Sequence, residues 1–130
     1  MKEETKKTDV LYRNILIKTE EVADMIKDSE DYDCYQRRLK RIRNKPDLYE
    51  QFNEFRRKLM IRRLESIDEG AVLEVESLYR EYSALLNDPL INSFLMAEQR
   101  LCGLMREVYD RLAARIPLDY TYMDGKDYEE

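Results

Sequence analysis

Cationic side chains are the residues of this chain that could most readily bind a ligand. Residues 37–63 carry eleven Lys or Arg against three acidic residues, a net charge of +8, although the whole chain carries −5 and the remainder therefore −13. Clustered guanidinium groups bind phosphates and carboxylates through charge-assisted hydrogen bonds. The candidate partner-binding basic face consists of Arg37, Arg38, Arg41, Arg56, Arg57 and Arg63. Its ligand would be RNA or an acidic protein, and the simpler alternative is a solvated face or one paired with acidic helices of the same or a neighbouring subunit.

Residues suited to catalysis are scarce. The chain has no histidine, which removes the commonest general base and every metal site that contains His. Its three glycines are widely separated and cannot form a phosphate-binding loop. Arg37 and Arg38 would favour a thiolate at Cys34, but neither a base nor an oxyanion loop accompanies that thiol. We therefore predict no enzymatic activity, no cofactor and no metal site.

Helices must position these side chains, because 39% of the residues are charged, only six are Gly or Pro, and no useful alternating strand pattern occurs. Five helices are predicted. The first covers about residues 8–27, and the second follows a cap at Ser29. Lys45-Pro46 separates the second from the third, and residues 66–70 form the turn before the fourth. The predicted fold is an all-α, elongated multihelical bundle with a long C-terminal helix.

The C-terminal helix has the clearest start and end signals. Asp88 is a suitable N-cap, Pro89 fits the first helical position, and Pro117 excludes helical geometry from the residue before it. The helix would be roughly 40 Å long at about 1.5 Å per residue, and its broad apolar stripe needs partners along that length. We predict a homo-oligomer, with a dimer as first expectation, whose self-association face consists of Leu90, Phe94, Leu101, Leu104, Met105 and Val108.

The remaining expectations concern organisation and compartment. Residues 1–118 are predicted to form one domain, and the acidic segment 119–130 a disordered tail. No apolar run is long enough to span a bilayer, and the N-terminal segment MKEETKKTD lacks a signal-peptide core. Cys34 and Cys102 are expected to be buried, reduced thiols. Together these features predict a cytoplasmic protein.

One segment carries a family resemblance. The pattern Leu-x-x-Asp-Pro-x-Ile-x-x-Phe-x-x-Ala-Glu-x-x-Leu, residues 85–101, resembles the most recognisable segment of the YlbF/YmcA family. Residues 29–35, 44–48 and 52–55 are similar to the earlier helices of that family, so the resemblance covers about residues 10–118. It implies an elongated, self-associating α fold. It also implies a non-enzymatic cytoplasmic regulator of development, competence or biofilm formation, acting in a multiprotein complex that influences RNA maturation by a membrane-anchored endoribonuclease.

One departure limits what the resemblance implies. Known members of that complex resemble one another in C-terminal cysteines linked to an iron–sulfur cluster, and this chain has no cysteine after Ile116. We predict a regulatory adaptor that acts through protein–protein interaction, in developmental control or in the regulation of RNA maturation. The alternatives are an RNA-associated protein that binds through residues 37–63 and a purely structural partner of a locally encoded protein.

Overall fold

The computed structural model describes residues 2–65 and 69–123. These residues contain six α-helices and one 3-10 turn, and no strand occurs among them. The elements are α1 (Lys2–Lys27), α2 (Glu30–Arg43), α3 (Pro46–Glu65), α4 (Glu69–Glu81), α5 (Ser83–Leu86), α6 (Pro89–Arg115) and η1 (Thr121–Met123). The predicted all-α fold with a long C-terminal helix is confirmed.

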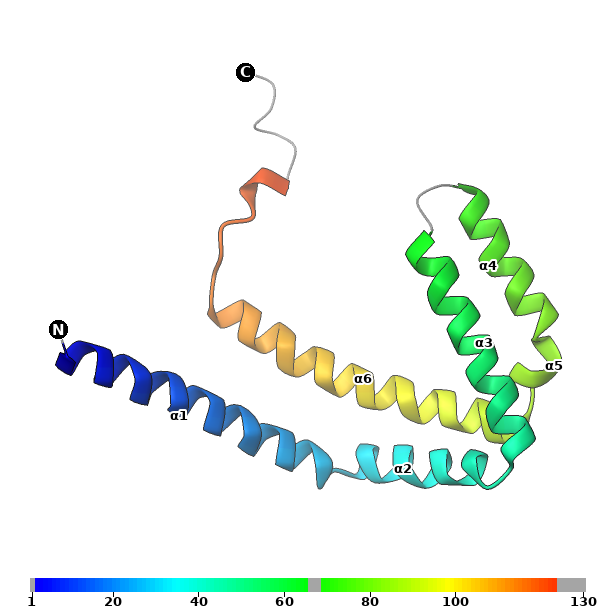
Figure 1. Cartoon of the computed structure of the whole chain (residues 1–130), viewed down its shortest axis with the longest axis horizontal. Coiled ribbons are helices and arrows are strands. Elements are labelled where there is room, and N and C mark those ends of the chain that lie inside the picture. The colour runs from blue at the N-terminus through cyan, green and yellow to red at the C-terminus, as the bar shows by residue number, and fades with distance from the viewer. Residues whose placement is uncertain (1, 66–68, 124–130) are drawn as a thin grey trace, which may run out of the picture.

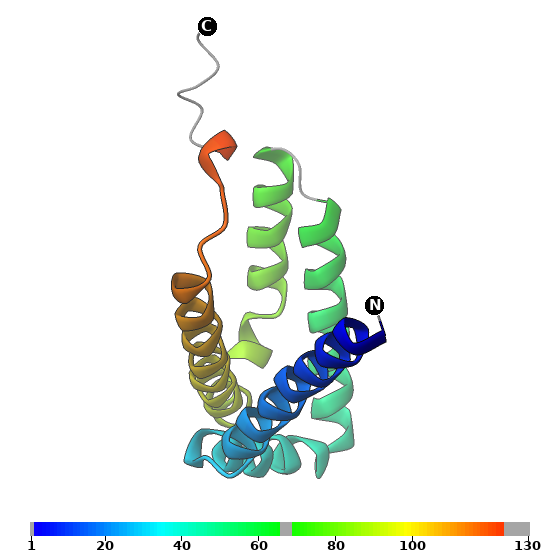
Figure 2. The same ribbon diagram turned by 90° about the vertical axis from the view of Figure 1, so that its left-hand side faces the viewer.

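The helices are arranged as an open L rather than a closed bundle (Figure 1). Helices α1 and α2 follow one another along the long limb, and α6 runs back beside α2 in the opposite direction. Helices α3 and α4 form a hairpin that rises from the far end of that limb, as the turned view also shows (Figure 2). We call α1 together with residues 102–115 of α6 the arm, and α3 with α4 the hairpin.

The buried core lies where the two limbs of the L meet. Phe94 of α6 packs edge-on against Phe52 of α3, with ring centroids 5.6 Å apart, and lies 5.2 Å from the ring of Tyr35 of α2. Such aromatic pairs add about 0.5–1.5 kcal/mol each beyond the area they bury. The core consists of Ile42, Phe52, Phe55, Leu78, Leu85, Ile91 and Phe94. Helices α2 to α6 contribute to it, and none of residues 6–27 of α1 does.

The predicted helix caps are present. Ser29 Oγ accepts a hydrogen bond from the backbone N–H of Tyr32 at 3.2 Å. Asp88 Oδ1 accepts one from the N–H of Leu90 at 2.9 Å, with Pro89 at the start of α6. These bonds satisfy backbone donors that the first turn of a helix leaves without an intrahelical acceptor. Helix α6 ends at Arg115, just before Pro117 as predicted.

Three boundaries differ from the prediction. Helix α1 begins at Lys2 rather than near residue 8. The fourth predicted helix is two helices, because the backbone at Tyr82 (φ −102°, ψ 21°) separates α4 from α5. Of the turn predicted at residues 66–70, Glu69 and Gly70 belong to α4, and residues 66–68 lie outside the described part of the chain.

The segment predicted as a disordered tail begins with a short ordered turn. Residues Thr121–Met123 form a 3-10 turn, in which Asp119 Oδ1 accepts hydrogen bonds from the backbone N–H (3.0 Å) and the hydroxyl (2.7 Å) of Thr121. These two bonds lower the pKa of the Asp119 carboxyl. Residues 124–130 lie outside the described residues.

Candidate functional site

The predicted basic face divides into two groups on different helices. On α2, Arg37, Arg38 and Arg41 line a small pocket of about 120 Å³ together with Cys34. Arg37 forms an ion pair with Asp33 on the same helix, with Nε and Oδ2 2.9 Å apart. This pair and Arg41 are exposed, so the outer surface of α2 has the features of a solvated helix face.

Arg38 has a role within the fold. Its Nη1 donates a hydrogen bond of 2.8 Å to the backbone carbonyl of Ser93, which ties α2 to α6 beside the core. The carbonyl lies in the first turns of α6, so the guanidinium fixes the position at which the two helices cross. Arg38 therefore contributes to the arrangement of α2 and α6 more than to an open binding face.

The basic residues of α3 point to different sides of that helix. The guanidinium carbon of Arg56 lies 4.3 Å from the ring centroid of Phe52 and 5.9 Å from that of Phe94, and Asn53 accepts a hydrogen bond from Arg56. Arg63 Nη2 donates to the Tyr79 hydroxyl at 3.2 Å, which joins α3 to α4. Arg57 is exposed on another side of α3. The sequence grouped these residues, but the structure does not place them on one surface.

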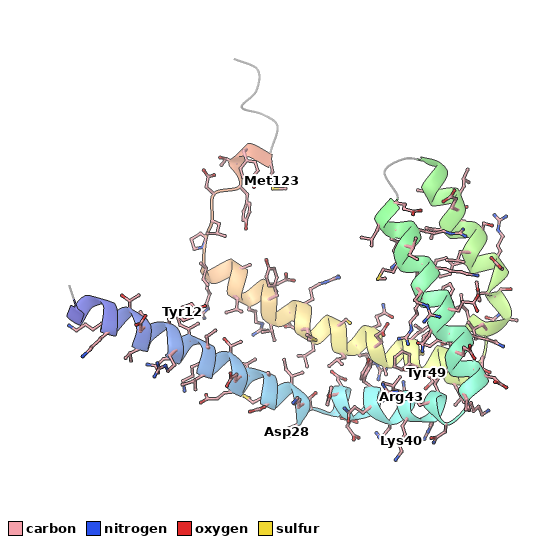
Figure 3. All side chains as sticks on the ribbon, viewed as in Figure 1. Tyr12, Asp28, Lys40, Arg43, Tyr49 and Met123 are labelled. Carbon is pink, nitrogen blue, oxygen red and sulfur yellow. The ribbon has the colours of Figure 1, made fainter. Side chains whose placement is uncertain are left out.

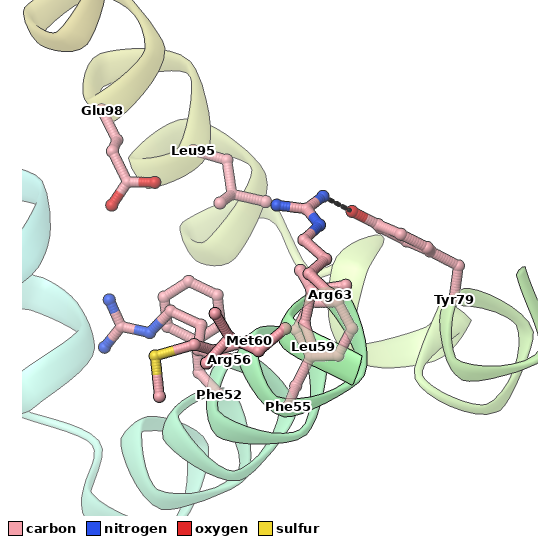
Figure 4. A pocket seen from close by; sticks show the side chains of 10 residues that line it. Phe52, Phe55, Arg56, Leu59, Met60, Arg63, Tyr79, Leu95 and Glu98 are labelled. Carbon is pink, nitrogen blue, oxygen red and sulfur yellow. Dashed lines mark hydrogen bonds between the residues drawn. The ribbon is translucent and has the colours of Figure 1, made fainter. Parts of the chain in front are cut away.

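Arg56 and Arg63 instead line the inner angle of the L. There a groove of about 510 Å³ is bounded by the hairpin on one side and by α6 on the other (Figure 4). Its apolar lining comes mainly from α3, with Tyr79 of α4 and Leu95 of α6, and Glu98 of α6 is its one acidic lining residue. We call this the corner groove. Its apolar lining includes Phe52, Phe55, Leu59, Met60, Leu64 and Leu95.

A polar network on the hairpin was not anticipated from the sequence. Lys58 Nζ lies 3.0 Å from Glu54 Oε1 and donates to the Tyr82 hydroxyl at 2.8 Å, and that hydroxyl donates to Glu54 Oε1 at 3.2 Å. Hydrogen bonds from Lys58, and then from Tyr82, lower the pKa of Glu54. The same network raises the pKa of Lys58. Tyr82 is also the residue between α4 and α5, so this network joins α3 to the point where those two helices are separated.

Two tyrosines near the core have pKa values shifted in opposite directions. Burial, and secondarily the charge of Glu98, raises the pKa of Tyr35. A hydrogen bond from Arg43 lowers the pKa of Tyr49, and the guanidinium carbon of Arg43 lies 5.7 Å from its ring centroid (Figure 3). Both phenols join helices at the corner, since Tyr35 packs on Phe94 of α6 and Tyr49 meets Arg43 of α2.

The arm leaves its apolar residues open. None of residues 6–27 of α1 is buried, and apolar side chains line that helix, as with Tyr12 in Figure 3. Between α1 and α6 lies a groove of about 410 Å³ whose surface is formed by apolar atoms, which we call the arm groove. The Thr19 hydroxyl at its edge already donates to the carbonyl of Ile15 at 2.8 Å. The residues that line the arm groove are Asn14, Ile15, Lys18, Thr19, Val22, Val108 and Leu112.

The six residues predicted as a self-association face occupy different environments. Phe94 is fully buried in the chain's own core, and Leu101 is also buried. Leu90, Leu104 and Val108 are half-buried, and Met105 is 55% exposed. Burial by the chain itself thus decreases along α6, from the fully buried Phe94 to the half-buried Leu104 and Val108 and the exposed Met105.

Comparison with known proteins places this fold in a family. Residues 15–117 match the family described as "Control of competence regulator ComK, YlbF/YmcA". A UPF0342 protein of Symbiobacterium thermophilum is 30% identical over 104 residues, which is 78% of this chain and 92% of the relative. The chain belongs to the YlbF/YmcA family. No solved structure matches it.

Membership of the YlbF/YmcA family gives the chain a regulatory role in general terms, in a family of regulators rather than of enzymes. This agrees with the resemblance seen in residues 85–101, which lie within the matched region. Among the helices that the structure describes, none is long and apolar enough to cross a membrane.

The cysteines of a single copy of this YlbF/YmcA member are too few for an iron–sulfur cluster, whose four ligands would require two chains. A cluster requires about four thiolate ligands, and the chain has two cysteines, neither in a disulfide. Cys34 is half-buried on α2, whereas Cys102 is exposed on α6, which corrects the expectation that both are buried. Within residues 2–65 and 69–123, no group of three or more potential metal ligands comes together.

Proposed function

We propose that this YlbF/YmcA-family chain is a non-enzymatic, cytoplasmic regulatory adaptor that self-associates through its arm and binds a protein partner. The observation that carries the proposal is the open apolar surface of the arm. Leu11 and Ile15 of α1 are 63% and 56% exposed, and Leu112 of α6 is 56% exposed. Contiguous apolar surface of this kind marks an interaction site, because exposing it to water is unfavourable.

A second copy is the proposed occupant of the arm. The arm groove has an apolar surface, which is the character of homodimer interfaces rather than of transient contacts. Of the residues predicted for self-association, Val108 lines the arm groove, and Leu104 and Met105 lie beside it in the part of α6 that belongs to the arm. Phe94 and Leu101 support the interface from inside the chain by fixing the course of α6.

Analytical ultracentrifugation over a range of protein concentrations tests self-association. The expected result is a reversible dimer at micromolar concentration, and a monomer throughout the range would contradict the proposal. For the adaptor role, the tagged chain is recovered from its host's lysate with and without ribonuclease. Specific proteins that remain bound after ribonuclease treatment support the adaptor, whereas loss of every partner would place RNA binding through residues 37–63 first.

A further inference from the structure

Large apolar side chains continue beyond the end of α6, in residues 116–123, which we call the C-terminal segment. The backbone leaves the helix at Ile116, where φ is −120° and ψ is 81°. Hydrogen bonds to Asp119 order part of the segment without removing its large side chains from water. Those more than half exposed include Ile116, Leu118, Tyr120 and Met123. Apolar surface left in water in this way marks a contact site.

The corner groove leaves apolar side chains uncovered at its open end. Phe52 and Phe55 are buried at the closed end, whereas Met60 and Leu64 are 56% and 77% exposed. The groove has a volume of about 510 Å³, which is enough for a few side chains of an incoming segment. Met is flexible and makes favourable contacts with aromatic rings, so this lining suits a segment that carries Tyr, Leu and Met.

The C-terminal segment and the hairpin rise on the same side of the long limb, from opposite ends of α6 (Figures 1 and 2). Within one chain the segment and the groove are far apart. Ile116 comes 18 residues after Glu98, a lining residue of the groove, which is roughly 27 Å at about 1.5 Å per helical residue. Extended chain advances at most about 3.5 Å per residue, so Tyr120 lies within roughly 14 Å of Ile116. Tyr120 therefore does not reach the groove of its own chain.

Self-association through the arm shortens this distance. In a two-fold symmetric dimer the same patch of both chains meets across the axis. An axis that crosses the arms parallel to the hairpins makes the two α6 helices antiparallel and keeps both hairpins on one side. Val108 and Leu112 are the residues through which α6 lines the arm groove. With the axis between them, Ile116 lies level with residues 100–108 of the second copy, roughly 3–15 Å along α6 from Glu98 of that copy.

We propose that the corner groove of each chain binds the C-terminal segment of a second copy, in a dimer whose arms are antiparallel. This inference rests on the proposed self-association and adds a second contact to it. Leu118 and Tyr120 would cover the exposed side chains at the open end of the groove. The Tyr120 hydroxyl would face α6, where the Glu98 carboxylate accepts hydrogen bonds. Each copy both offers a groove and fills one, so the contact closes within the dimer.

A two-fold axis along the arms would give a different arrangement. It makes the two α6 helices parallel and brings the two corners to the same end of the dimer. Each C-terminal segment then stays about as far from the groove of the second copy as from its own. Occupation of the groove therefore depends on antiparallel arms, and a contact between position 120 of one chain and α3 of the other reports both.

Photo-cross-linking of the purified full chain tests the proposal. The photoreactive residue p-benzoylphenylalanine replaces Tyr120 in unlabelled chains, which are mixed with isotope-labelled native chains and allowed to exchange. Sedimentation velocity on the same samples establishes that dimers are present. Mass spectrometry then identifies the linked peptides and the chain from which each comes. The expected product joins position 120 to residues 52–64 of a labelled chain.

Reciprocal and control positions use the same photoreactive residue. In place of Met60, inside the groove, it should capture residues 116–123 of a labelled chain. In place of Arg57, which is exposed on another side of α3, it should capture little of that segment. Equal capture at both positions would mean that the C-terminal segment meets α3 without occupying the groove, which would overturn the inference.

A matched pair of substitutions tests the groove itself. Leu64→Asp places a charge where the C-terminal segment would bury it, and it should lower the yield from position 120 about tenfold. Leu73→Asp places the same charge on α4 outside the groove, where the side chain is also exposed, and it should leave the yield unchanged. Neither position lines the arm groove, so dimers should persist in both variants.

The outcomes separate the inference from the proposed function. Dimers that give no link from position 120 to α3 of another chain, or links only within one chain, would overturn the inference and leave self-association through the arm intact. An equal loss of yield in both aspartate variants would overturn it as well. A protein that stays monomeric at every concentration would contradict the self-association on which the inference rests.

Discussion

Truncating two apolar side chains of the arm groove should dissociate the self-associated protein. Ile15 lines the groove from α1 and Leu112 from α6, and each is 56% exposed in the single chain. Fully burying such a side chain is worth about 1.5–3 kcal/mol, so covering the exposed half contributes about 1 kcal/mol each. The double variant Ile15→Ala with Leu112→Ala removes four such side chains from a symmetric dimer. The expected loss of association free energy is therefore about 4 kcal/mol, which raises the dissociation constant roughly a thousandfold.

Sedimentation velocity across a concentration series measures this change. The matched control is Val72→Ala with Leu73→Ala on the hairpin, where both side chains are also more than half exposed but lie outside the arm groove. Alanine has high helix propensity, so the hairpin pair should not reduce the helicity seen by circular dichroism, and the arm pair should reduce it only as far as dissociation of the dimer exposes α1. The reasoning is refuted if the arm variant keeps a dissociation constant within tenfold of the native value, or if the hairpin control weakens association equally.

Three further predictions concern the single chain. Asp88→Ala should lower the free energy of unfolding by about 1 kcal/mol in urea titrations, because the N–H of Leu90 loses its acceptor. Asp88→Ser keeps a side-chain oxygen at the cap and should retain most of the stability of the native chain. Phe94→Ala should lower the free energy of unfolding by about 3–5 kcal/mol and abolish cooperative unfolding. Met96→Ala, on an exposed side of α6, should change the free energy of unfolding little. The lowered pKa of Glu54 means that its stabilisation is present above the ordinary glutamate pKa and is lost as pH falls through the lowered value. Glu54→Gln should thus flatten the fall in the urea midpoint between about pH 5 and pH 3, and an unchanged pH profile would contradict the role given to Lys58 and Tyr82.

Features set by neighbouring residues could be predicted from the sequence. The caps at Ser29 and Asp88 depend on a side chain and on backbone groups within three residues of it, so the local pattern was sufficient. The polar network around Tyr82 could not be found in this way, because its other members, Lys58 and Glu54, lie 24 and 28 residues away.

The sites were less predictable than the helices, for a related reason. An apolar stripe indicates which side of a helix is buried but not what buries it. Phe94 and Met105 belong to one stripe of α6, yet the chain itself covers Phe94 and leaves Met105 open. In the same way, Arg41 and Arg63 are close in the sequence, but α2 and α3 diverge at the corner of the L and carry them to different surfaces (Figure 1).

The open arm links the folding of this chain to its association. Helix α1 has 26 residues, but none of those at positions 6–27 is buried, and its main packing within the chain is against α2. An isolated helix in water is held mainly by its own backbone bonds and is only marginally stable, and most helices in proteins depend on a packed apolar face. In the proposed dimer a second copy would supply that face, so the helicity of α1 should rise with protein concentration together with dimer formation. The core around Phe94 needs no such help, because five helices of one chain already enclose it. Under the proposed function, one part of the L, the core at the corner, is ordered by the single chain, whereas the order of the arm would depend on a second copy, so that an adaptor built in this way would respond to its assembly state.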